Sequence, residues 1–404
     1  MSDDVLILGA GPAGSTLAWR LARAGLRVRI ADRADFPRSK PCGEFLSPAC
    51  AGHLRELGFD DPCAQLGATP VRSMCLGGFG VTATGRFRHL PGRPDASAPG
   101  FGIRRSVLDE RLLRAAEAAG ARFTPRTEFL ALLRDGNGRV AGAAVQNGAT
   151  TTRLPARFVV GADGLHSRVA RSMGVHRRVA WLDQFALTTH YATAEPHDDA
   201  DVHLLPSGFA ATTGVGEGIF SFNLVLPRTR FRGRTTGDWD AFVQAHVAGS
   251  ERIAARLAAA RRCGPWRGCG PFGHRTTTVW QPGVALVGDA AGYVDPMTGE
   301  GIYYALFGAR ALAGAVIAAL ADPDAEADAL AGYAAARRRE LGPRMRAASL
   351  LQRALRHPFV VRSGLRALER WPALCDLVVT LTGDTIHPRE LWRPSFWRDF
   401  RRAL

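Results

Sequence analysis

Three turns rich in glycine and aspartate carry the residues of this chain that could do chemistry. The first is GAGPAG, in which Gly9, Gly11 and Gly14 stand at G-x-G-x-x-G spacing. Gly9 permits a sharp turn, Gly11 leaves room for a pyrophosphate against the backbone, and Gly14 lets a helix pack closely on a sheet. Asp32 follows at the end of the next apolar run, where an acid accepts hydrogen bonds from ribose hydroxyls. The stretch predicts a dinucleotide site rather than a plain structural turn.

The other two turns repeat this pattern further along the chain. GADGLHS, at 161–167, follows the apolar run of 158–160 and contains Asp163. GDAAGYVDPMTGEG, at 288–301, follows the apolar run of 284–287 and ends where a helix of small residues begins. Amides at a helix N-terminus stabilise negative charge. We therefore expect all three turns to serve one anionic ligand.

Alternating strand and helix patterns must position these turns. Val5–Leu8 is a short apolar run typical of a strand buried on both faces, and a helix and a second strand follow it. Between about 179 and 227 the pattern changes to alternating polar and apolar residues, which indicates an antiparallel sheet over a pocket. His190, Phe220, Phe222 and Asn223 are its candidate lining residues, with ordinary sheet roles as the alternative. We further expect helices over 15–24, 106–120 and 238–260, with Ser106 as the cap of the second. A hairpin turn is expected at 135–138 and an exposed loop at 91–100.

Composition limits the class of protein. With 46% hydrophobic and 22% charged residues, the 404-residue chain is typical of a globular protein with room for two domains. The net charge of +15 comes almost wholly from arginine, since Lys40 is the sole lysine, and no nucleic-acid module accompanies it, so we expect no nucleic-acid partner. Seven scattered cysteines suggest neither disulfides nor a metal site. We expect a cytoplasmic protein without a signal peptide. We also expect no membrane span, because the apolar run of 309–321 is short and contains Arg310.

The C-terminal segment is the most basic part of the chain. Residues 337–404 hold 15 arginines against 6 acids, a net charge of +9, within the helical patterns RALERWPALCDLVVTL and ELWRPSFWRDFRRAL. One interpretation is a lid over the active site. A second is a basic, tryptophan-bearing face that rests peripherally on the anionic inner membrane surface. A third is ordinary packing with solvated arginines.

Together, the three turns in this order resemble those of FAD-dependent oxidoreductases with the para-hydroxybenzoate-hydroxylase-like fold, the group A flavoprotein monooxygenases. The resemblance covers about 330 residues. Within that group, PCG at 41–43 and DPMTGEGIYYA at 295–305 are most similar to the geranylgeranyl reductase branch. Glu44 departs from the Cys-Gly-Gly pattern of those reductases, and SGFAATTGVGEG, at 207–218, replaces their aromatic signature.

The resemblance implies an α/β fold, in which a Rossmann-type FAD-binding domain is interleaved with an antiparallel-sheet substrate domain and followed by C-terminal helices. The expected boundaries are 1–75, 101–178 and 276–336 for the FAD-binding domain, 76–100 and 179–275 for the substrate domain, and 337–404 for the C-terminal helices.

The resemblance also implies roles for the matching residues. The ADP half of FAD would lie at the first turn and Asp32, its middle at Arg105, and its pyrophosphate and ribityl groups at Asp163 and Asp289. Reduced flavin carries negative charge, which the amides at the end of the third turn would stabilise. Cys42 would lie beside flavin and substrate, as in the reductases. The full candidate set for FAD binding is Gly9, Gly11, Gly14, Asp32, Arg33, Arg38, Cys42, Arg105, Asp163, Gly288, Asp289, Pro296, Gly299, Glu300, Gly301 and Ile302, and the catalytic candidates are Cys42, Pro296, Gly299 and Gly301.

Three functions fit this reading. The first is a monooxygenase in which NADPH or NADH, docking transiently because no second glycine fingerprint is visible, reduces FAD for oxygen transfer to a bulky aromatic or polyketide-like substrate. The second is a reductase that moves hydride to a carbon–carbon double bond of a large apolar lipid. The third is a flavin-holding partner protein without catalysis. The sequence by itself favours the monooxygenase, with a small apolar molecule as its substrate.

Overall fold

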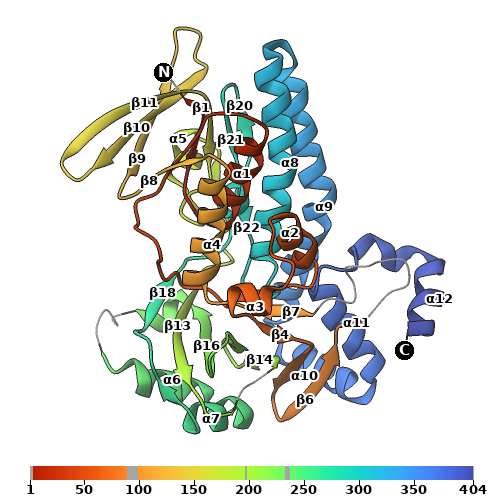
Figure 1. Cartoon of the computed structure of the whole chain (residues 1–404). Helices are drawn as coiled ribbons and strands as arrows, with labels where there is room; N and C mark the ends of the chain where they lie inside the picture. Colours follow the sequence, from red (N-terminus) through yellow and green to blue (C-terminus); the bar gives the residue numbers. More distant parts are fainter. Residues whose placement is uncertain (1–2, 89–98, 196–197, 233–236, 404) are drawn as a thin grey trace.

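The computed structural model describes residues 3–88, 99–195, 198–232 and 237–403. Two lobes lie one above the other in Figure 1, and the last helices flank the lower lobe. Most of the loop expected at 91–100 lies outside the described residues.

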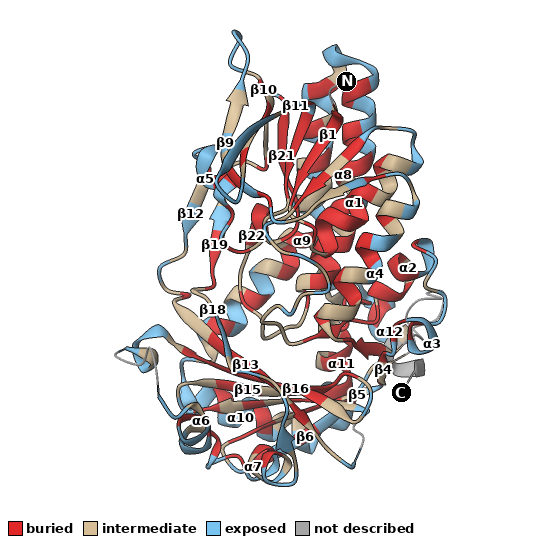
Figure 2. Ribbon diagram, turned by 60° about the vertical axis from the view of Figure 1, so that its left-hand side comes forward, coloured by how far each residue is buried: buried red, intermediate tan, exposed pale blue. Residues whose placement is uncertain are grey.

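The upper lobe is built on a parallel sheet, as the first turn predicts. Strand β1 pairs in parallel with β2 and β11, and β11 pairs in parallel with β21. Figure 2 shows these strands buried beside α1 and α8. This sheet runs in the order β20 (Trp280–Gln281), β21 (Val284–Leu286), β11 (Thr150–Gly161), β1 (Asp3–Leu8), β2 (Val28–Ala31), β8 (Arg122–Thr124), extended by β9 (Glu128–Arg134) and β10 (Val140–Asn147).

Helix α1 (Pro12–Arg23) packs against both α4 (Arg105–Ala118) and α8 (Gly301–Ala321). The expected cap of α4 is wrong, because the helix begins at Arg105 and has no side-chain cap of its own. Instead, the distant Glu44 accepts a hydrogen bond from the Arg105 amide at 2.8 Å. A tertiary contact thus satisfies the amide that a local serine was expected to satisfy.

The lower lobe is built on the expected sheet. Its strands run in the order β17 (Arg261–Arg262), β13 (Gln184–Ala192), β16 (Ile219–Pro227), β15 (Gly208–Gly214), β14 (Asp199–Leu205), β5 (Ser73–Gly78), β6 (Val81–Arg86), with β18 (Arg267–Cys269) on β13. They are antiparallel except where β14 and β5 pair in parallel. The sheet takes in residues from Ser73, three before the expected boundary. The single helix expected over 238–260 is two helices, α6 (Trp239–Val247) and α7 (Glu251–Ala258), which are separated at Gly249 and Ser250.

Helix α8 is longer than the apolar run suggested. Its 21 residues include an 18-residue window with a mean hydropathy of 1.7, enough by length and composition to cross a membrane, but 61% of that window is buried inside the fold. Packing of α8 against α1 and α9 (Glu326–Ala354) therefore makes it a core helix.

Helix α9 runs through the expected boundary at 336/337, so the C-terminal region is continuous with the upper lobe. It contains Pro343, which cannot donate to the carbonyl of Arg339. His387 contacts that carbonyl through Nε2 at 3.3 Å.

After α9 come α10 (Pro358–Arg370), α11 (Pro372–Thr382) and α12 (Pro394–Ala403). The other α-helices and strands are α2 (Cys50–Glu56), α3 (Pro62–Leu66), α5 (Arg168–Ser172), β3 (Phe45–Leu46), β4 (Thr69–Val71), β7 (Gly100–Gly102), β12 (His176–Arg178), β19 (His274–Thr276) and β22 (Gly292–Tyr293).

Candidate active site

A cavity lies where the three turns meet the sheet of the lower lobe. It encloses about 1170 Å³, part of which is open to solvent. The lining residues that the sequence singled out are Gly11, Cys42, Arg105, Asp289, Pro296, Gly299, Gly301 and Ile302. These residues come from segments almost 300 positions apart in the chain, and the fold brings them to one place.

The glycines of the first turn have the geometry that a dinucleotide requires. Gly9 has φ +113°, and a Cβ there would lie 2.4 Å from the carbonyl oxygen of Ala162. A Cβ on Gly14 would lie 1.9 Å from the oxygen of Gly9. At Gly11, by contrast, the nearest atom is Arg38 Nη2 at 3.7 Å. The turn is therefore tightly packed on the protein side and bare at Gly11, beside the N-terminus of α1.

Asp32 holds this turn in place. Its carboxylate accepts from the Ala10 amide at 2.7 Å and from the Ala34 amide at 2.9 Å. Of the neighbouring candidates, Arg33 is exposed, while Arg38 pairs with Asp109 at 3.2 Å.

One carboxylate oxygen of Asp163, in the second turn, accepts hydrogen bonds, and the other has no hydrogen-bond partner among the described residues. Oδ2 accepts from the amides of Arg168 and Val169 at 2.7 and 3.1 Å, at the start of α5. Oδ1 is buried and has no partner in the described part of the chain. Burial raises the pKa of this carboxyl. A buried acceptor without a partner marks a place where a ligand hydroxyl or amide fits.

Cys42 and Arg105 meet on the far side of the cavity. Arg105 is buried and forms an ion pair with Asp109 at 2.7 Å, which excludes a surface role for this arginine. Burial alone would lower its pKa, but the charge of Asp109 and the contact with Cys42 raise it. The Glu44 amide donates to Cys42 Sγ at 3.3 Å.

One residue of this cluster, Glu44, was not singled out by the sequence, and His190, expected to line the pocket, instead contacts Glu44 and is not among the lining residues. Glu44 is buried, and its Oε2 lies 2.7 Å from His190 Nε2. Its φ is +58°, in the left-handed region that favours glycine. The signal was present in the sequence, because Glu44 stands where the reductase pattern has a glycine. His190 had only been proposed as a pocket residue of the sheet.

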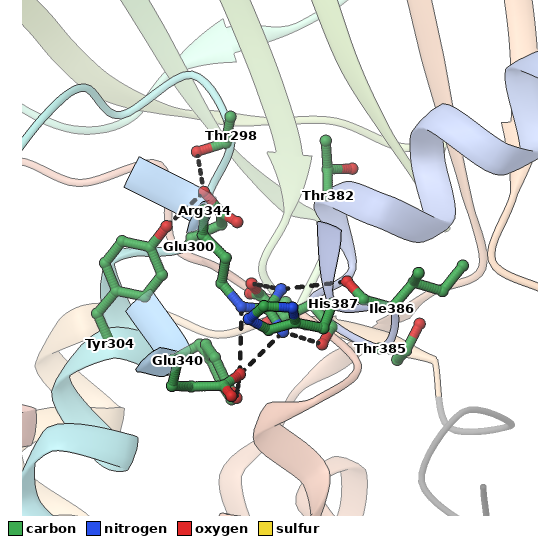
Figure 3. A network of polar contacts seen from close by, with 12 residues as sticks. Thr298, Glu300, Tyr304, Glu340, Arg344, Thr382, Thr385, Ile386 and His387 are labelled. Atoms are coloured by element: carbon green, nitrogen blue, oxygen red, sulfur yellow. Dashed lines mark hydrogen bonds and ion pairs between the residues drawn. The ribbon is translucent and has the colours of Figure 1, made fainter. Parts of the chain in front are cut away.

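The residues of the third turn face in two directions. Pro296, Gly299 and Gly301 line the cavity. Glu300 does not, because it accepts hydrogen bonds from Thr298 Oγ1 and Tyr304 Oη, both at 2.7 Å. Figure 3 shows Glu300 within a polar network that also contains Arg344 of α9 and residues of the segment after α11. Through these hydrogen bonds Glu300 holds the 295–301 turn to helix α8, and it does not line the cofactor cavity.

The lower lobe closes the cavity with the alternate face of its sheet. Along β16, Asn223 and Val225 line the cavity, while Phe220 and Phe222 point to the opposite side and pack with α6 and α7. This alternation follows from the period of two in a strand. The remaining lining from this lobe is Ala186, Thr188, Phe209, Ala211, Cys269 and Phe272.

A second cavity, of about 910 Å³ including space open to solvent, lies between the lower sheet and the last helices. Its lining is almost wholly apolar. Met297 and Thr298 of the third turn form part of its wall, so this turn separates the two cavities. The rest of the wall comprises Met74, Leu76, Val202, Leu204, Leu351, Ala354, Leu355, Val360, Val361, Gly364, Leu365, Leu368, Val378 and Thr382.

The residues of the first cavity suit a dinucleotide that carries a redox ring. A bare glycine turn at a helix N-terminus and the amides that open α8 supply what phosphates and a reduced ring need. The unpartnered oxygen of Asp163 lies in the chain between Ala162 and Gly164, which line the cavity. A group of side chains in the lower lobe, outside this cavity, has atoms close enough together to hold a metal ion: Cys75, Asp201 and His203. There Arg252 binds Asp201 at 2.7 Å.

Comparison with known proteins agrees with this fit. The FAD binding domain family matches residues 2–347, and the chain belongs to that family. It is 30% identical over 347 residues to digeranylgeranylglycerophospholipid reductase 2 of Methanopyrus kandleri, covering 82% of this chain and 81% of the relative. The menaquinone reductase of Mycobacterium tuberculosis H37Rv is 29% identical, with 76% and 74% covered.

Solved structures show the same architecture. The myxobacterial chondrochloren halogenase CndH matches with a TM-score of 0.77 and 26% identity, over 86% of this chain and 82% of that one. PqsL from Pseudomonas aeruginosa, a probable FAD-dependent monooxygenase, shares the fold at a TM-score of 0.68 and 24% identity, over 91% and 100%. The protein is an FAD-dependent oxidoreductase, and both the expected fold and the expected FAD are confirmed.

Proposed function

We propose that this enzyme reduces a carbon–carbon double bond in a large apolar lipid. Bound FAD, once reduced, supplies a hydride for such chemistry. The observation that carries the proposal is the apolar cavity whose wall includes the 295–301 turn. The aliphatic tail of the lipid would lie in that cavity while its reacting double bond reaches past the turn into the first cavity, where Cys42 lies. The relatives named as lipid and menaquinone reductases support this substrate class.

The turn itself would position the reacting parts. Gly299 has φ +72°, and a Cβ there would meet the ring of Phe45 at 2.7 Å, so only glycine leaves this surface bare. The amides that open α8 at Gly301 would stabilise negative charge on a reduced ring. Apolar side chains of the lower sheet, such as Phe209 and Val225, would keep water out.

Reduction of a double bond also needs a proton on the second carbon. We assign this proton to the thiol of Cys42, which lines the cavity. With hydride delivered to one carbon, the Cys42 thiol would give its proton to the other carbon, and the resulting thiolate would regain a proton from solvent. The nearby Glu44 and His190, 2.7 Å apart, form the polar path for that return. NADPH or NADH from solution would be the reductant, as expected from the sequence.

A second candidate is the monooxygenase that the sequence by itself favours. The fold shared with PqsL, a probable FAD-dependent monooxygenase, supports it. The dry wall of the first cavity would serve oxygen transfer to an aromatic substrate equally well.

Oxygen dependence separates the two candidates. Under anaerobic conditions, with NADPH and a detergent-dispersed polyprenyl lipid, we expect a product heavier by two hydrogens in mass spectrometry. Cys42→Ala should slow product formation at least tenfold while leaving flavin reduction unchanged, because it removes the proton donor and not the cofactor site. Cys269→Ala, which alters another cavity cysteine, is the matched control. A product that forms only with O2 and carries its oxygen would establish the monooxygenase instead.

A further inference from the structure

Large apolar side chains reach the surface mainly in one part of the chain. Nine such side chains are exposed among the described residues, and all but Ile317 fall between 350 and 397. Four of them gather where α9 ends and α10 begins, and we call this group the α9–α10 corner. It consists of Leu350, Leu351, Phe359 and Val360, which are 63%, 38%, 82% and 48% exposed. Single exposed apolar residues are ordinary, but such a cluster marks an interaction site.

The α9–α10 corner is continuous with the apolar cavity. Leu351 and Val360 are exposed and also line that cavity. On the inner side of α10, Val361 and Leu365 are buried and belong to the same wall. An apolar surface therefore runs without interruption from the outside of the molecule to the third turn beside the cofactor site.

Unpaired positive charge borders the corner. The guanidinium groups of Arg353 and Arg356 lie over the ring of Trp181, at 5.0 and 5.2 Å from its centre. Within the part of the chain that the structure describes, neither these arginines nor Arg362 has a carboxylate partner. Residues 350–404 contain ten arginines and five acids, a net charge of +5.

We propose that the α9–α10 corner docks on an anionic lipid bilayer and admits substrate into the apolar cavity from it. Exposed Phe, Leu and Val beside arginines are the composition of an interfacial anchor, whose apolar tips enter the lipid while the cations meet the headgroups. A second copy of the chain fits less well, because two such corners would bring arginines of like charge together. The docking stands without the proposed function, and only the route of the substrate rests on it.

Vesicle co-sedimentation of the FAD-loaded full chain tests the docking. We expect binding to vesicles of phosphatidylcholine with 30% phosphatidylglycerol, weaker binding to phosphatidylcholine alone, and release by 0.5 M NaCl, because screening removes the headgroup contribution. The double variant Leu350→Ser, Phe359→Ser should bind at least tenfold more weakly, since it removes the two most exposed tips that do not line the cavity. Ile317→Ser, at 37% exposure on α8, is the matched control and should bind like the wild type.

Several results would overturn the proposal. These are a wild-type protein that stays in the supernatant with both vesicles at low salt, a double variant that sediments like the wild type, or a wild-type dimer in solution that the double variant abolishes. The double variant should keep its FAD absorbance, and an apolar-to-polar change at exposed positions leaves the core intact. Arg353→Gln with Arg356→Gln provides a second variant, expected to lose the preference for phosphatidylglycerol.

Failure of the docking and failure of the proposed function are distinguishable. Vesicle binding is measured without turnover, whereas double-bond reduction is measured on detergent-dispersed lipid without vesicles. If both the reductase function and the membrane docking are correct, the double variant should lose activity on substrate held in vesicles and keep its activity on substrate dispersed in detergent.

Discussion

The two cavities of this enzyme are made in different ways. One side of the cofactor cavity is shaped by backbone, since its first turn leaves no room for a Cβ at Gly9 or Gly14 and leaves Gly11 bare, whereas side chains of the lower sheet form the other side. The apolar cavity is shaped by side chains of moderate size from two strands and three helices. One wall, the 295–301 turn, belongs to both.

The difference predicts that the cofactor cavity accepts few substitutions and that the apolar cavity accepts more. Backbone amides and glycine contacts tolerate few substitutions, so a site made from them selects one ligand. Aliphatic walls accept volume-conserving changes at low cost. An enzyme family can therefore keep its cofactor while its substrates diverge, as the lipid reductase and halogenase relatives of this chain illustrate.

The largest effect is expected on the backbone-made side of the cofactor cavity. Gly14→Ala should abolish FAD binding and destabilise the fold, because its Cβ would lie 1.9 Å from the Gly9 oxygen. Gly11→Ala should leave the apoprotein folded, since nothing but Arg38 lies near that Cβ, yet weaken FAD binding at least tenfold. Fluorescence titration with FAD and thermal unfolding of the apoprotein measure the two effects.

Gly314→Ala on α8 is the control for this pair, because a Cβ there meets nothing within 4 Å. It should bind FAD normally and be slightly more stable, as alanine favours a helix. If Gly11→Ala bound FAD like the wild type, the first turn would not be the phosphate site.

The free energy of unfolding should depend on pH through Asp295, which belongs to the 295–301 turn shared by the two cavities. Burial raises the pKa of Asp295 to about 7, although the Met297 amide and Gln352 Nε2 donate to it. As pH rises from about 4 to 7, the unfolded chain releases this proton while the folded protein keeps it, so stability falls and then levels off. Asp295→Asn cannot titrate and should gain up to about 4 kcal/mol over the wild type by pH 8.

Thermal unfolding of the FAD-loaded protein between pH 4.5 and pH 8 measures this gain. Asp35→Asn, at an exposed loop position, is the control and should change little with pH. A constant difference between Asp295→Asn and the wild type across that range would contradict the prediction.

The smallest effect should come from filling the side-chain cavity. Gly364 of α10 lines it, and a Cβ there meets nothing within 4 Å. Gly364→Leu should raise KM for a long polyprenyl substrate about tenfold, or about 1.4 kcal/mol, and leave a short analogue and FAD binding unaffected. Gly332→Leu, an open position on α9 outside the cavity, is the matched variant. Equal KM values for Gly364→Leu and the wild type would place the lipid elsewhere.

The sequence predicted the parts of the site that are local. Gly9, Gly11 and Asp289 occupy the expected turns, because a strand, a glycine turn and a helix are specified within about 30 residues. It missed the cap that Glu44 gives to α4, because that contact joins residues 61 positions apart in the chain. It also missed the hydrogen bonds that Glu300 accepts from Thr298 and Tyr304, although both partners are local.

The sequence by itself predicted an α/β chain in which a Rossmann-type FAD-binding domain is interleaved with a second domain built on a largely antiparallel sheet. Its cofactor turns are short, and their chemistry lies in residue types at fixed spacing. Only the tertiary structure decided where the last helices lie, which side chains form the apolar cavity and where that cavity meets the surface. Those features arise from packing between segments hundreds of residues apart, and no local pattern encodes such contacts.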